Sequence, residues 1–206
     1  TKKGIAVCNT PSQEVVDAVA EHTLALLLSI AKRIHEDEIY VRAHKWKSWA
    51  PKLLLGTQIK GKTIGIIGLG RIGKGVAERA SHGFGMNVLY YDVRKDSKFE
   101  KKYSAKKVSL TTLLKKSDFI TLHVNLTPNT KHLIGKKELA LMKPTAYIIN
   151  TSRGPVIDEK ALTTALKNKK IAGAGLDVHE VEPSKNHALH KLNNCILTPH
   201  TASATV

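Results

Sequence analysis

The sequence is poor in cysteine and in long apolar runs. Its 2 cysteines, Cys8 and Cys195, are too far apart in the chain for a metal-ligand spacing, and they offer no disulfide framework. The longest apolar run, Leu24–Ala31, is far shorter than the roughly 20 residues that cross a bilayer. No secretory-signal pattern opens the sequence, because residues 1–4 are followed only by the short apolar stretch Ile5–Cys8. We therefore expect a cytoplasmic protein with no structural metal and no membrane partner.

Acidic residues are also scarce, since 17 Asp and Glu stand against 33 Lys and Arg for a formal net charge of +16. Such a balance can indicate a nucleic-acid or membrane partner. The excess, however, is mostly lysine, arginine is scarce, and no aromatic residues are interleaved with it. The lysines form pairs near predicted helix ends, namely Lys101-Lys102, Lys106-Lys107, Lys115-Lys116, Lys136-Lys137 and Lys169-Lys170. We interpret them as solvated helix faces that attract anionic cofactors, and we expect no nucleic-acid partner.

The segment Lys62–Asp92 is the most informative part of the sequence. Its β-branched run, residues 62–67, predicts a buried strand, and Gly68-Leu69-Gly70-Arg71-Ile72-Gly73 then has the G-x-G-x-x-G spacing. A helical pattern and a second apolar run follow, ending at Asp92, 24 positions after Gly68. A glycine cluster alone is weak, because a sheet protein without a ligand can carry one. The strand before it, the helix after it and the acid together predict a dinucleotide-binding site.

Each part of this pattern has a physical role. Gly68 allows a sharp turn, Gly70 lets the backbone approach a pyrophosphate, and Gly73 lets the helix pack close to the sheet. The N–H groups at the helix N-terminus then face the phosphates. Asp92 can accept hydrogen bonds from both ribose hydroxyls and would repel a 2′-phosphate, which favours NAD over NADP. Arg94 and Lys95 follow it and soften that preference.

The first 60 residues predict a long helix and a partner surface. Gly4–Cys8 reads as a short strand or extended lead-in, and Thr10 and Pro11 form a helix start signal. The helix runs to about His44 with a break near His35, and it is apolar almost all round at residues 24–31, so it is buried within this domain or between subunits. Residues 44–56, here called the arm, then hold both tryptophans, Trp46 and Trp49, with Pro51 and Leu53-Leu54-Leu55. The arm packs on a second copy or on a missing domain, or it folds back onto this chain.

Strands and helices alternate through the rest of the sequence. This alternation predicts an α/β fold, a doubly wound parallel sheet of the Rossmann type with helices on both faces. The expected strands are 107–108, 118–124, 146–150, 172–178 and 195–197, and the expected helices begin at Leu110, Lys136 and Glu159. Ligands of such sheets bind at the carboxyl ends of the strands.

Three of those strand ends carry polar residues that suit a nicotinamide enzyme. Arg153 offers a planar set of donors to a carboxylate, although a single arginine is more often a surface residue. Asp177, Glu180 and Glu182 follow another strand, and His200 follows the last. Such an enzyme needs an acid–base group and a substrate anchor, and these residues supply both.

These motifs together give the sequence a specific resemblance. It resembles the D-2-hydroxyacid dehydrogenase family, which includes glyoxylate and hydroxypyruvate reductases and phosphoglycerate dehydrogenase. Trp49-Ala50-Pro51 before Leu55-Gly56 is most similar to the glyoxylate and hydroxypyruvate reductase branch. The other matching stretches are Asn9-Thr10-Pro11, Val19-Ala20-Glu21, the glycine pattern, Leu126-Thr127-Pro128, Asn150-Thr151-Ser152-Arg153-Gly154, Gly175-Leu176-Asp177-Val178, Glu182-Pro183 and Thr198-Pro199-His200.

The resemblance implies an NAD-dependent oxidoreductase that interconverts a small 2-oxo acid and its D-2-hydroxy acid. Arg153 would hold the substrate, His200 would donate the proton, and Glu182 would hydrogen-bond His200 and favour its charged form. Asp177 would bind the nicotinamide amide, and Thr151 and Ser152 would lie under its ring. The implied cofactor-binding residues are Gly68, Gly70, Arg71, Ile72, Gly73, Asp92, His123, Asn125, Thr130, Thr151, Ser152, Arg153, Asp177 and His200.

The resemblance also implies a domain organisation. Residues 1–206 correspond to the cofactor-binding domain of a two-domain dehydrogenase, with a linking helix and dimerisation arm over 9–60 and a Rossmann core over 61–206. The family's N-terminal substrate lobe and C-terminal helix are absent, so we expect this chain to bind NAD(H) but to be poorly active by itself. The apolar helix and the arm indicate a homodimer. Two residues depart from the family pattern: Asn125 stands where proline is usual, and His179 replaces an aromatic residue.

Two relatives of different function are alternatives. Corepressors of the same family keep the three catalytic positions but act as NAD-sensing proteins that bind partners. The formate dehydrogenase branch is disfavoured, because it normally carries glutamine at the position of Glu182.

Overall fold

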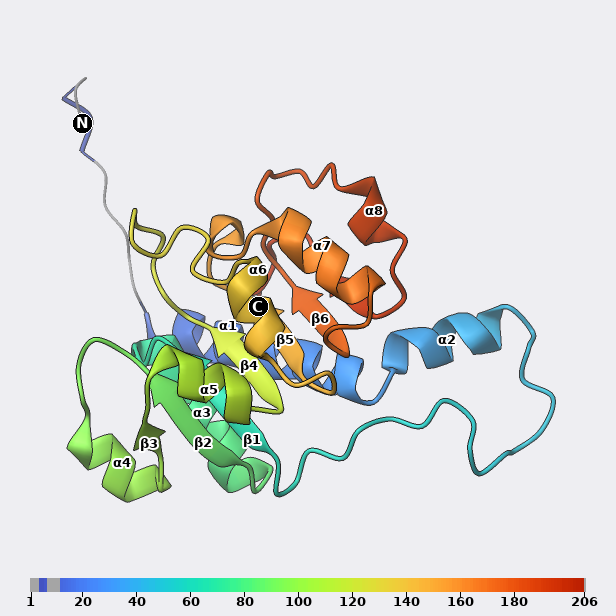
Figure 1. Ribbon diagram of the computed structural model, residues 1–206, viewed down its shortest axis with the longest axis horizontal. Coiled ribbons are helices and arrows are strands. Elements are labelled where there is room, and N and C mark those ends of the chain that lie inside the picture. Colours follow the sequence, from blue (N-terminus) through green and yellow to red (C-terminus); the bar gives the residue numbers. More distant parts are fainter. Residues whose placement is uncertain (1–3, 7–11, 206) are drawn as a thin grey trace.

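The computed structural model describes residues 4–6 and 12–205, and these residues form one parallel seven-stranded sheet (Figure 1). The strand order is β3-β2-β1-β4-β5-β6-β7, so the chain moves outward from β1 to β3 and then returns to start again beside β1. This confirms the predicted doubly wound, Rossmann-like α/β fold. The strands are β1 (Thr63–Ile67), β2 (Asn87–Tyr91), β3 (Lys106–Lys107), β4 (Phe119–Leu122), β5 (Tyr147–Asn150), β6 (Gly173–Leu176) and β7 (Cys195–Leu197).

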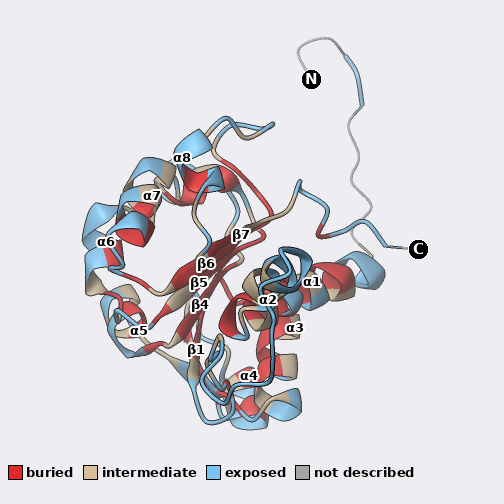
Figure 2. Cartoon of the chain, turned by 90° about the vertical axis from the view of Figure 1, so that its right-hand side faces the viewer, coloured by how far each residue is buried: buried red, intermediate tan, exposed pale blue. Residues whose placement is uncertain are grey.

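Helices cover both faces of this sheet (Figure 2). One face carries α1 (Gln13–Ala31) and α3 (Arg71–Glu78), which continues into a π-helical turn, η1 (Arg79–Gly83). The opposite face carries α5 (Leu110–Lys116), α6 (Lys136–Leu141) and α7 (Glu159–Lys167). The remaining short elements are α2 (Ile34–Arg42), α4 (Ser97–Tyr103), η2 (Gly154–Val156) and α8 (His187–His190). In the part of the chain that the structure describes, no helix has both the length and the apolar character to cross a membrane.

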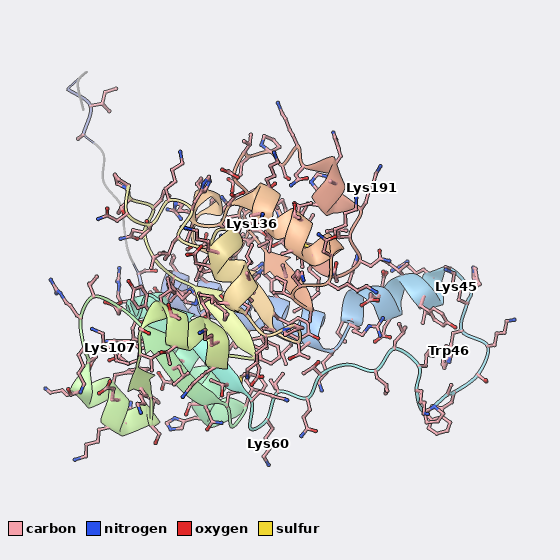
Figure 3. The ribbon with its side chains drawn as sticks, viewed as in Figure 1. Lys45, Trp46, Lys60, Lys107, Lys136 and Lys191 are labelled. Carbon is pink, nitrogen blue, oxygen red and sulfur yellow. The ribbon has the colours of Figure 1, made fainter. Side chains whose placement is uncertain are left out.

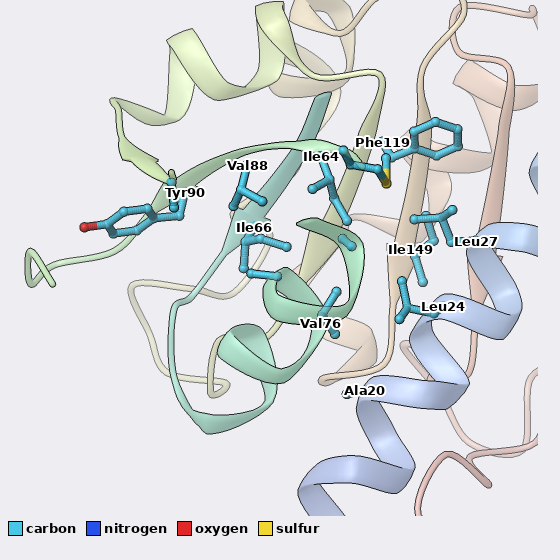
Figure 4. Close-up of a cluster of buried hydrophobic side chains, with 14 of the residues drawn as sticks. Ala20, Leu24, Leu27, Ile64, Ile66, Val76, Val88, Tyr90, Phe119 and Ile149 are labelled. Carbon is cyan, nitrogen blue, oxygen red and sulfur yellow. The ribbon is translucent and has the colours of Figure 1, made fainter. Parts of the chain in front are cut away.

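The central strands are apolar without alternation because both faces of the sheet are covered. In β1, Ile64 and Ile66 belong to the core cluster under α1, whereas Ile67 belongs to the cluster under α5. Figure 4 shows the first cluster, in which Leu24 and Leu27 of α1 lie against the sheet. The apolar stretch of α1 is therefore buried within this domain.

The first long helix is broken near its predicted position. The predicted start signal, Thr10 and Pro11, lies outside the described residues. The helix begins at Gln13, where the Ser12 hydroxyl accepts a hydrogen bond from the Val15 N–H at 3.3 Å. The break comes at Arg33, two residues before His35, because Arg33 takes a left-handed conformation with φ of 59° and separates α1 from α2.

Helix α2 and the arm extend away from the sheet (Figure 1). Helix α2 buries none of its residues, and Trp46, Trp49 and Leu55 are 59%, 82% and 64% exposed. Figure 3 shows Trp46 on this outlying segment, while Lys107, Lys136 and Lys191 lie on separate parts of the molecule. The tryptophans of the arm therefore do not fold back onto this chain.

A partly buried carboxylate ties the starts of two central strands together. Asp118 Oδ2 accepts a hydrogen bond from the Thr63 N–H at 2.9 Å, and its Oδ1 accepts one from Lys143 Nζ at 2.8 Å. Burial opposes ionisation of Asp118, but these hydrogen bonds and the nearby positive charges outweigh burial and lower the pKa of the carboxyl.

We therefore expect Asp118→Asn to destabilise the domain by about 1–3 kcal/mol at pH 7, because an N–H and an ammonium group lose a charged acceptor. The pKa of Asp118 is lower in the folded than in the unfolded chain, so its stabilisation is complete at neutral pH and is lost as the pH falls through the folded pKa. Urea unfolding at a series of pH values measures the difference in unfolding free energy between the wild type and Asp118→Asn. This difference should become smaller at acidic pH. For the control Asp37→Asn on α2, the difference from the wild type should not depend on pH in this way.

Candidate active site

The glycine loop, residues 68–73, connects β1 to α3. Gly68 has φ of +93°, and a Cβ there would lie 2.9 Å from the carbonyl carbon of His123. A Cβ on Gly73 would lie 2.1 Å from the Gly68 oxygen. Both positions therefore require glycine for the chain's own packing. Gly70 differs, because a Cβ there would meet nothing within 4 Å, so this side of the loop is open to an approaching group.

Asp92 holds this loop from the tip of β2. Its Oδ2 accepts a hydrogen bond from the Leu69 N–H at 2.7 Å, and its Oδ1 accepts one from the Arg94 N–H at 3.0 Å. Each carboxylate oxygen can accept a further hydrogen bond. Asp92 is half-buried, and the neighbouring Arg94 is exposed.

Gly70→Ala gives a prediction that separates cofactor binding from folding. The added methyl group meets no protein atom within 4 Å, so the melting temperature should stay within about 2 °C of the wild type, since surface substitutions usually change stability little. NADH affinity should fall by about tenfold or more, because the methyl group keeps the backbone away from the pyrophosphate. Isothermal titration with NADH measures this. Gly83→Ala is the matched control, since its Cβ also meets nothing within 4 Å and should leave affinity unchanged.

The loop after β4 follows the carboxyl end of that strand, at the same edge of the sheet as the glycine loop. Thr130 Oγ1 donates a hydrogen bond to the Asn125 oxygen at 2.6 Å and accepts one from the Thr127 N–H at 2.7 Å, which closes the loop on itself. His123 begins this loop, and its main-chain N–H donates to the Ile67 oxygen at 2.8 Å. Its Nε2 is shielded from solvent, and burial lowers the pKa of His123 to about 3, so the ring is neutral at physiological pH.

The tip of β5 is organised by Asn150. Its Oδ1 accepts hydrogen bonds from Ser152 N–H and Oγ at 3.0 and 2.8 Å, and its Nδ2 donates to the Arg153 oxygen at 3.0 Å. This leaves the Arg153 side chain exposed, with Nη1 donating to the Ser152 oxygen at 2.6 Å. Thr151 points the other way, and its hydroxyl lies 2.8 Å from that of Thr23 on α1.

The tips of β5 and β6 touch at Gly154. A Cβ at Gly154 would lie 1.8 Å from the His179 oxygen, so the two loops meet backbone to backbone. Glu180 reinforces this contact, since its Oε1 lies 2.6 Å from His132 Nε2 and its Oε2 accepts a hydrogen bond from the Glu159 N–H at 3.3 Å. The loop that carries Glu182 is therefore held on both sides.

Asp177 holds residues 198–202, here called the His200 loop. Its carboxylate is fully buried and accepts hydrogen bonds from Thr198 Oγ1 at 2.6 Å and from the Thr201 and Ala202 N–H groups at 2.9 Å each. The His200 N–H donates to the Asp177 main-chain oxygen at 2.8 Å. The expected contact between Asp177 and a nicotinamide amide stays a prediction, and the contacts that the chain itself makes show a positioning role.

His200 and Glu182 form a hydrogen-bonded pair. His200 Nδ1 lies 2.8 Å from Glu182 Oε2, while Glu182 Oε1 accepts a hydrogen bond from the His179 N–H at 3.0 Å. Partial burial opposes ionisation of Glu182, but the hydrogen bonds from His200 and His179 outweigh it and lower the pKa of the carboxyl. Since Glu182 occupies Nδ1, the Nε2 of His200 is the nitrogen left for a substrate.

The sheet register places these tips along one edge. Asn150, Leu176 and Leu197 are paired across the adjacent strands β5, β6 and β7, so the three strands end in one row. Arg153 and His200 each follow that row by three residues, and Asp177 follows it by one. Neighbouring strands lie about 4.8 Å apart, so the ends of β5 and β7 are separated by about 10 Å. Arg153, Asp177 and His200 thus follow the carboxyl ends of three adjacent strands.

Sequence comparison agrees with this geometry. The profile of the D-isomer specific 2-hydroxyacid dehydrogenase, NAD binding domain, matches residues 24–202. The chain belongs to this family. A glyoxylate reductase of Thermococcus litoralis is 53% identical over 209 residues, a match that covers 100% of this chain and 62% of that protein. The chain therefore spans under two thirds of this relative's length.

Solved structures of the family have the same fold. The TT0316 protein of Thermus thermophilus superimposes with a TM-score of 0.91 at 42% identity, covering 99% of this chain and 63% of that one. A D-isomer specific 2-hydroxyacid dehydrogenase of Lactobacillus delbrueckii ssp. bulgaricus, in its NAD-complexed form, has a TM-score of 0.82 at 35% identity over 91% of this chain and 60% of that one.

Several residues that organise this site carry no signal of their own in the sequence. Asn150 and Thr198 belong to the matching motifs, but the pattern does not show that their side chains fix the Arg153 and His200 segments. Thr23 and His22 lie on α1, more than 120 residues before the groups that they contact. Only the helix-to-sheet packing brings them together.

Proposed function

We propose that the chain is the cofactor-binding domain of an NAD-dependent reductase of small 2-oxo acids such as glyoxylate or hydroxypyruvate. The observation that carries this proposal is the His200–Glu182 hydrogen bond of 2.8 Å at the sheet edge where Arg153 and the glycine loop also lie. The open side of Gly70 fits a bound pyrophosphate, and the family relationship supports the same chemistry. We assign the substrate lobe to the part of the relatives' sequences that lies outside their match with this chain.

A bound nicotinamide cofactor would supply the hydride for the carbonyl carbon of the 2-oxo acid. Arg153 binds the substrate carboxylate with its planar guanidinium and orients the carbonyl. His200 transfers a proton from Nε2 to the carbonyl oxygen, while Glu182 fixes the ring through Nδ1 and stabilises the charged imidazole. Oxidation of the D-2-hydroxy acid uses the same groups in reverse.

NAD rather than NADP is the proposed cofactor. The Asp92 carboxylate lies at the tip of β2 beside the glycine loop, where it can accept hydrogen bonds from ribose hydroxyls and repel a 2′-phosphate. Titration with NADH and with NADPH tests this directly. Equal or tighter binding of NADPH would contradict it.

A homodimer formed through the arm is also proposed. Trp46, Trp49 and Leu55 expose a large apolar area that monomeric proteins rarely leave in water. Analytical ultracentrifugation should give a dimer for the wild-type gene product and a monomer for a Trp46→Ser/Trp49→Ser variant. A wild-type monomer would contradict this part of the proposal.

Steady-state assays with glyoxylate, hydroxypyruvate and pyruvate test the function. The gene product that contains this chain should oxidise NADH with at least one of these acids, and purified residues 1–206 should bind NADH with little turnover. NADH binding without turnover by the gene product would instead favour the NAD-sensing, partner-binding alternative.

A further inference from the structure

His22 contacts the residues that hold the His200 loop, although it lies on a helix that is distant in sequence. It lies on α1, and its Nε2 is 3.1 Å from Thr198 Oγ1 and 3.4 Å from Asp177 Oδ1. Within residues 12–205, no other basic side chain comes within 4 Å of the Asp177 carboxylate. His22 is 24% exposed, whereas the Asp177 side chain is fully buried.

The hydrogen-bond directions follow from the number of available hydrogens. Thr198 has one hydroxyl hydrogen, and it is donated to Asp177 Oδ1 at 2.6 Å. Thr198 Oγ1 must therefore accept from His22, so Nε2 of His22 carries a hydrogen. The result is a directed series of hydrogen bonds from His22 to Thr198 and from Thr198 to Asp177.

Asp177 connects this series of hydrogen bonds to the backbone beside His200. The same carboxylate accepts from the Thr201 and Ala202 N–H groups, and the Asp177 main-chain oxygen accepts from the His200 N–H. His200 itself has φ of 58°, a left-handed conformation that a non-glycine residue adopts only when its surroundings hold it there. The direction of the imidazole therefore depends on the contacts of Asp177.

We propose that His22 is a positioning residue for His200, acting through Thr198 and Asp177. This inference rests on the proposed acid–base role of His200. The next residue on α1 makes a parallel contact, since Thr23 Oγ1 lies 2.8 Å from Thr151 Oγ1 at the tip of β5. Successive residues of one helix thus fix the strand ends that carry Arg153 and His200, and a displacement of α1 would move both.

Amide hydrogen exchange tests the positioning without reference to activity. In His22→Ala, exchange of the Thr201 and Ala202 amides should accelerate by about tenfold, the effect of weakening one hydrogen bond, while the amides of α7 stay unchanged. His22→Gln keeps an N–H donor and should restore most of the protection. His35→Ala on α2 is the matched control and should leave both regions as in the wild type. Unchanged exchange at Thr201 and Ala202 in His22→Ala would overturn the inference.

Turnover of the gene product gives the second readout. His22→Ala should lower kcat by about 10-fold to 100-fold, because a misplaced acid transfers its proton poorly, while the Kd of NADH stays within about twofold. Thr198→Val breaks the same series of bonds, so the double variant should lose no more activity than the worse single variant. Additive losses would contradict the inference. A wild-type gene product without turnover would refute the proposed function, and the exchange result would still decide whether His22 holds the loop.

Discussion

His200→Ala is expected to lower kcat for 2-oxo acid reduction by about 100-fold to 10,000-fold, the contribution of a positioned acid–base group. NADH should bind this variant almost as tightly as the wild type, because the imidazole is held by Glu182 and not by the glycine loop. The fold should also survive, since the loop is tied down through the Asp177 contacts with the backbone and with Thr198.

Stopped-flow mixing of the NADH-loaded variant with substrate measures this loss at the chemical step. His187→Ala is a suitable control, because it removes an exposed histidine from α8 that makes no contact with the His200–Glu182 pair. Turnover of His200→Ala at the wild-type rate would refute the assigned role. A loss of NADH binding would show that the residue serves the cofactor and not the proton.

Arg153→Ala is expected to lower kcat/KM by about 100-fold, which corresponds to about 3 kcal/mol for two charge-assisted hydrogen bonds. The wild-type side chain is exposed and bonds only to the Ser152 oxygen within the described chain, so the melting temperature should hardly change. Arg153→Lys should recover little, because an ammonium group cannot form the paired planar contact of a guanidinium with a carboxylate.

Separate measurement of the KM for the substrate and of the Kd for NADH provides an internal check. The KM for glyoxylate should rise while the Kd of NADH stays within about twofold, because the lost contact is to the substrate. Arg42→Ala, at the exposed end of α2, is the control. If Arg153→Ala left KM unchanged, the carboxylate would have to be bound by another cation, and the proposed substrate site would be wrong.

The fold could be predicted from the sequence because its signals are local. The glycine loop, the apolar strands and the helices between them each occupy a short continuous stretch, and the observed strands β1, β5 and β7 differ from the predicted bounds by at most one residue. The short helices α4 and α8 escaped prediction. Helix α4 buries only Phe99 and Tyr103, and a capping bond from the Phe99 N–H to Asp96 starts it, which is too little for a visible period.

The site was predictable only in part, for a physical reason. Parallel strands bring all their carboxyl ends to one edge, so Arg153, Asp177 and His200 could be assigned to a common edge from the sequence alone. The side chains that fix those residues were not identifiable, because contacts such as His22 to Thr198 span 176 positions of sequence. Such contacts depend on how α1 packs on the sheet. The arm shows the same limit, since its exposure is visible only in the structure.

The joint action of Arg153 and His200 on one substrate can be seen in a crystal structure of the gene product with NADH and oxamate, an unreactive analogue of a small 2-oxo acid. We expect the oxamate carboxylate to contact Arg153, its carbonyl oxygen to lie within about 3 Å of His200 Nε2, and the nicotinamide ring to stack beside both. We also expect His200 to keep its hydrogen bond to Glu182. A nicotinamide ring bound away from His200, or an oxamate held by neither Arg153 nor His200, would refute the proposed roles of both residues.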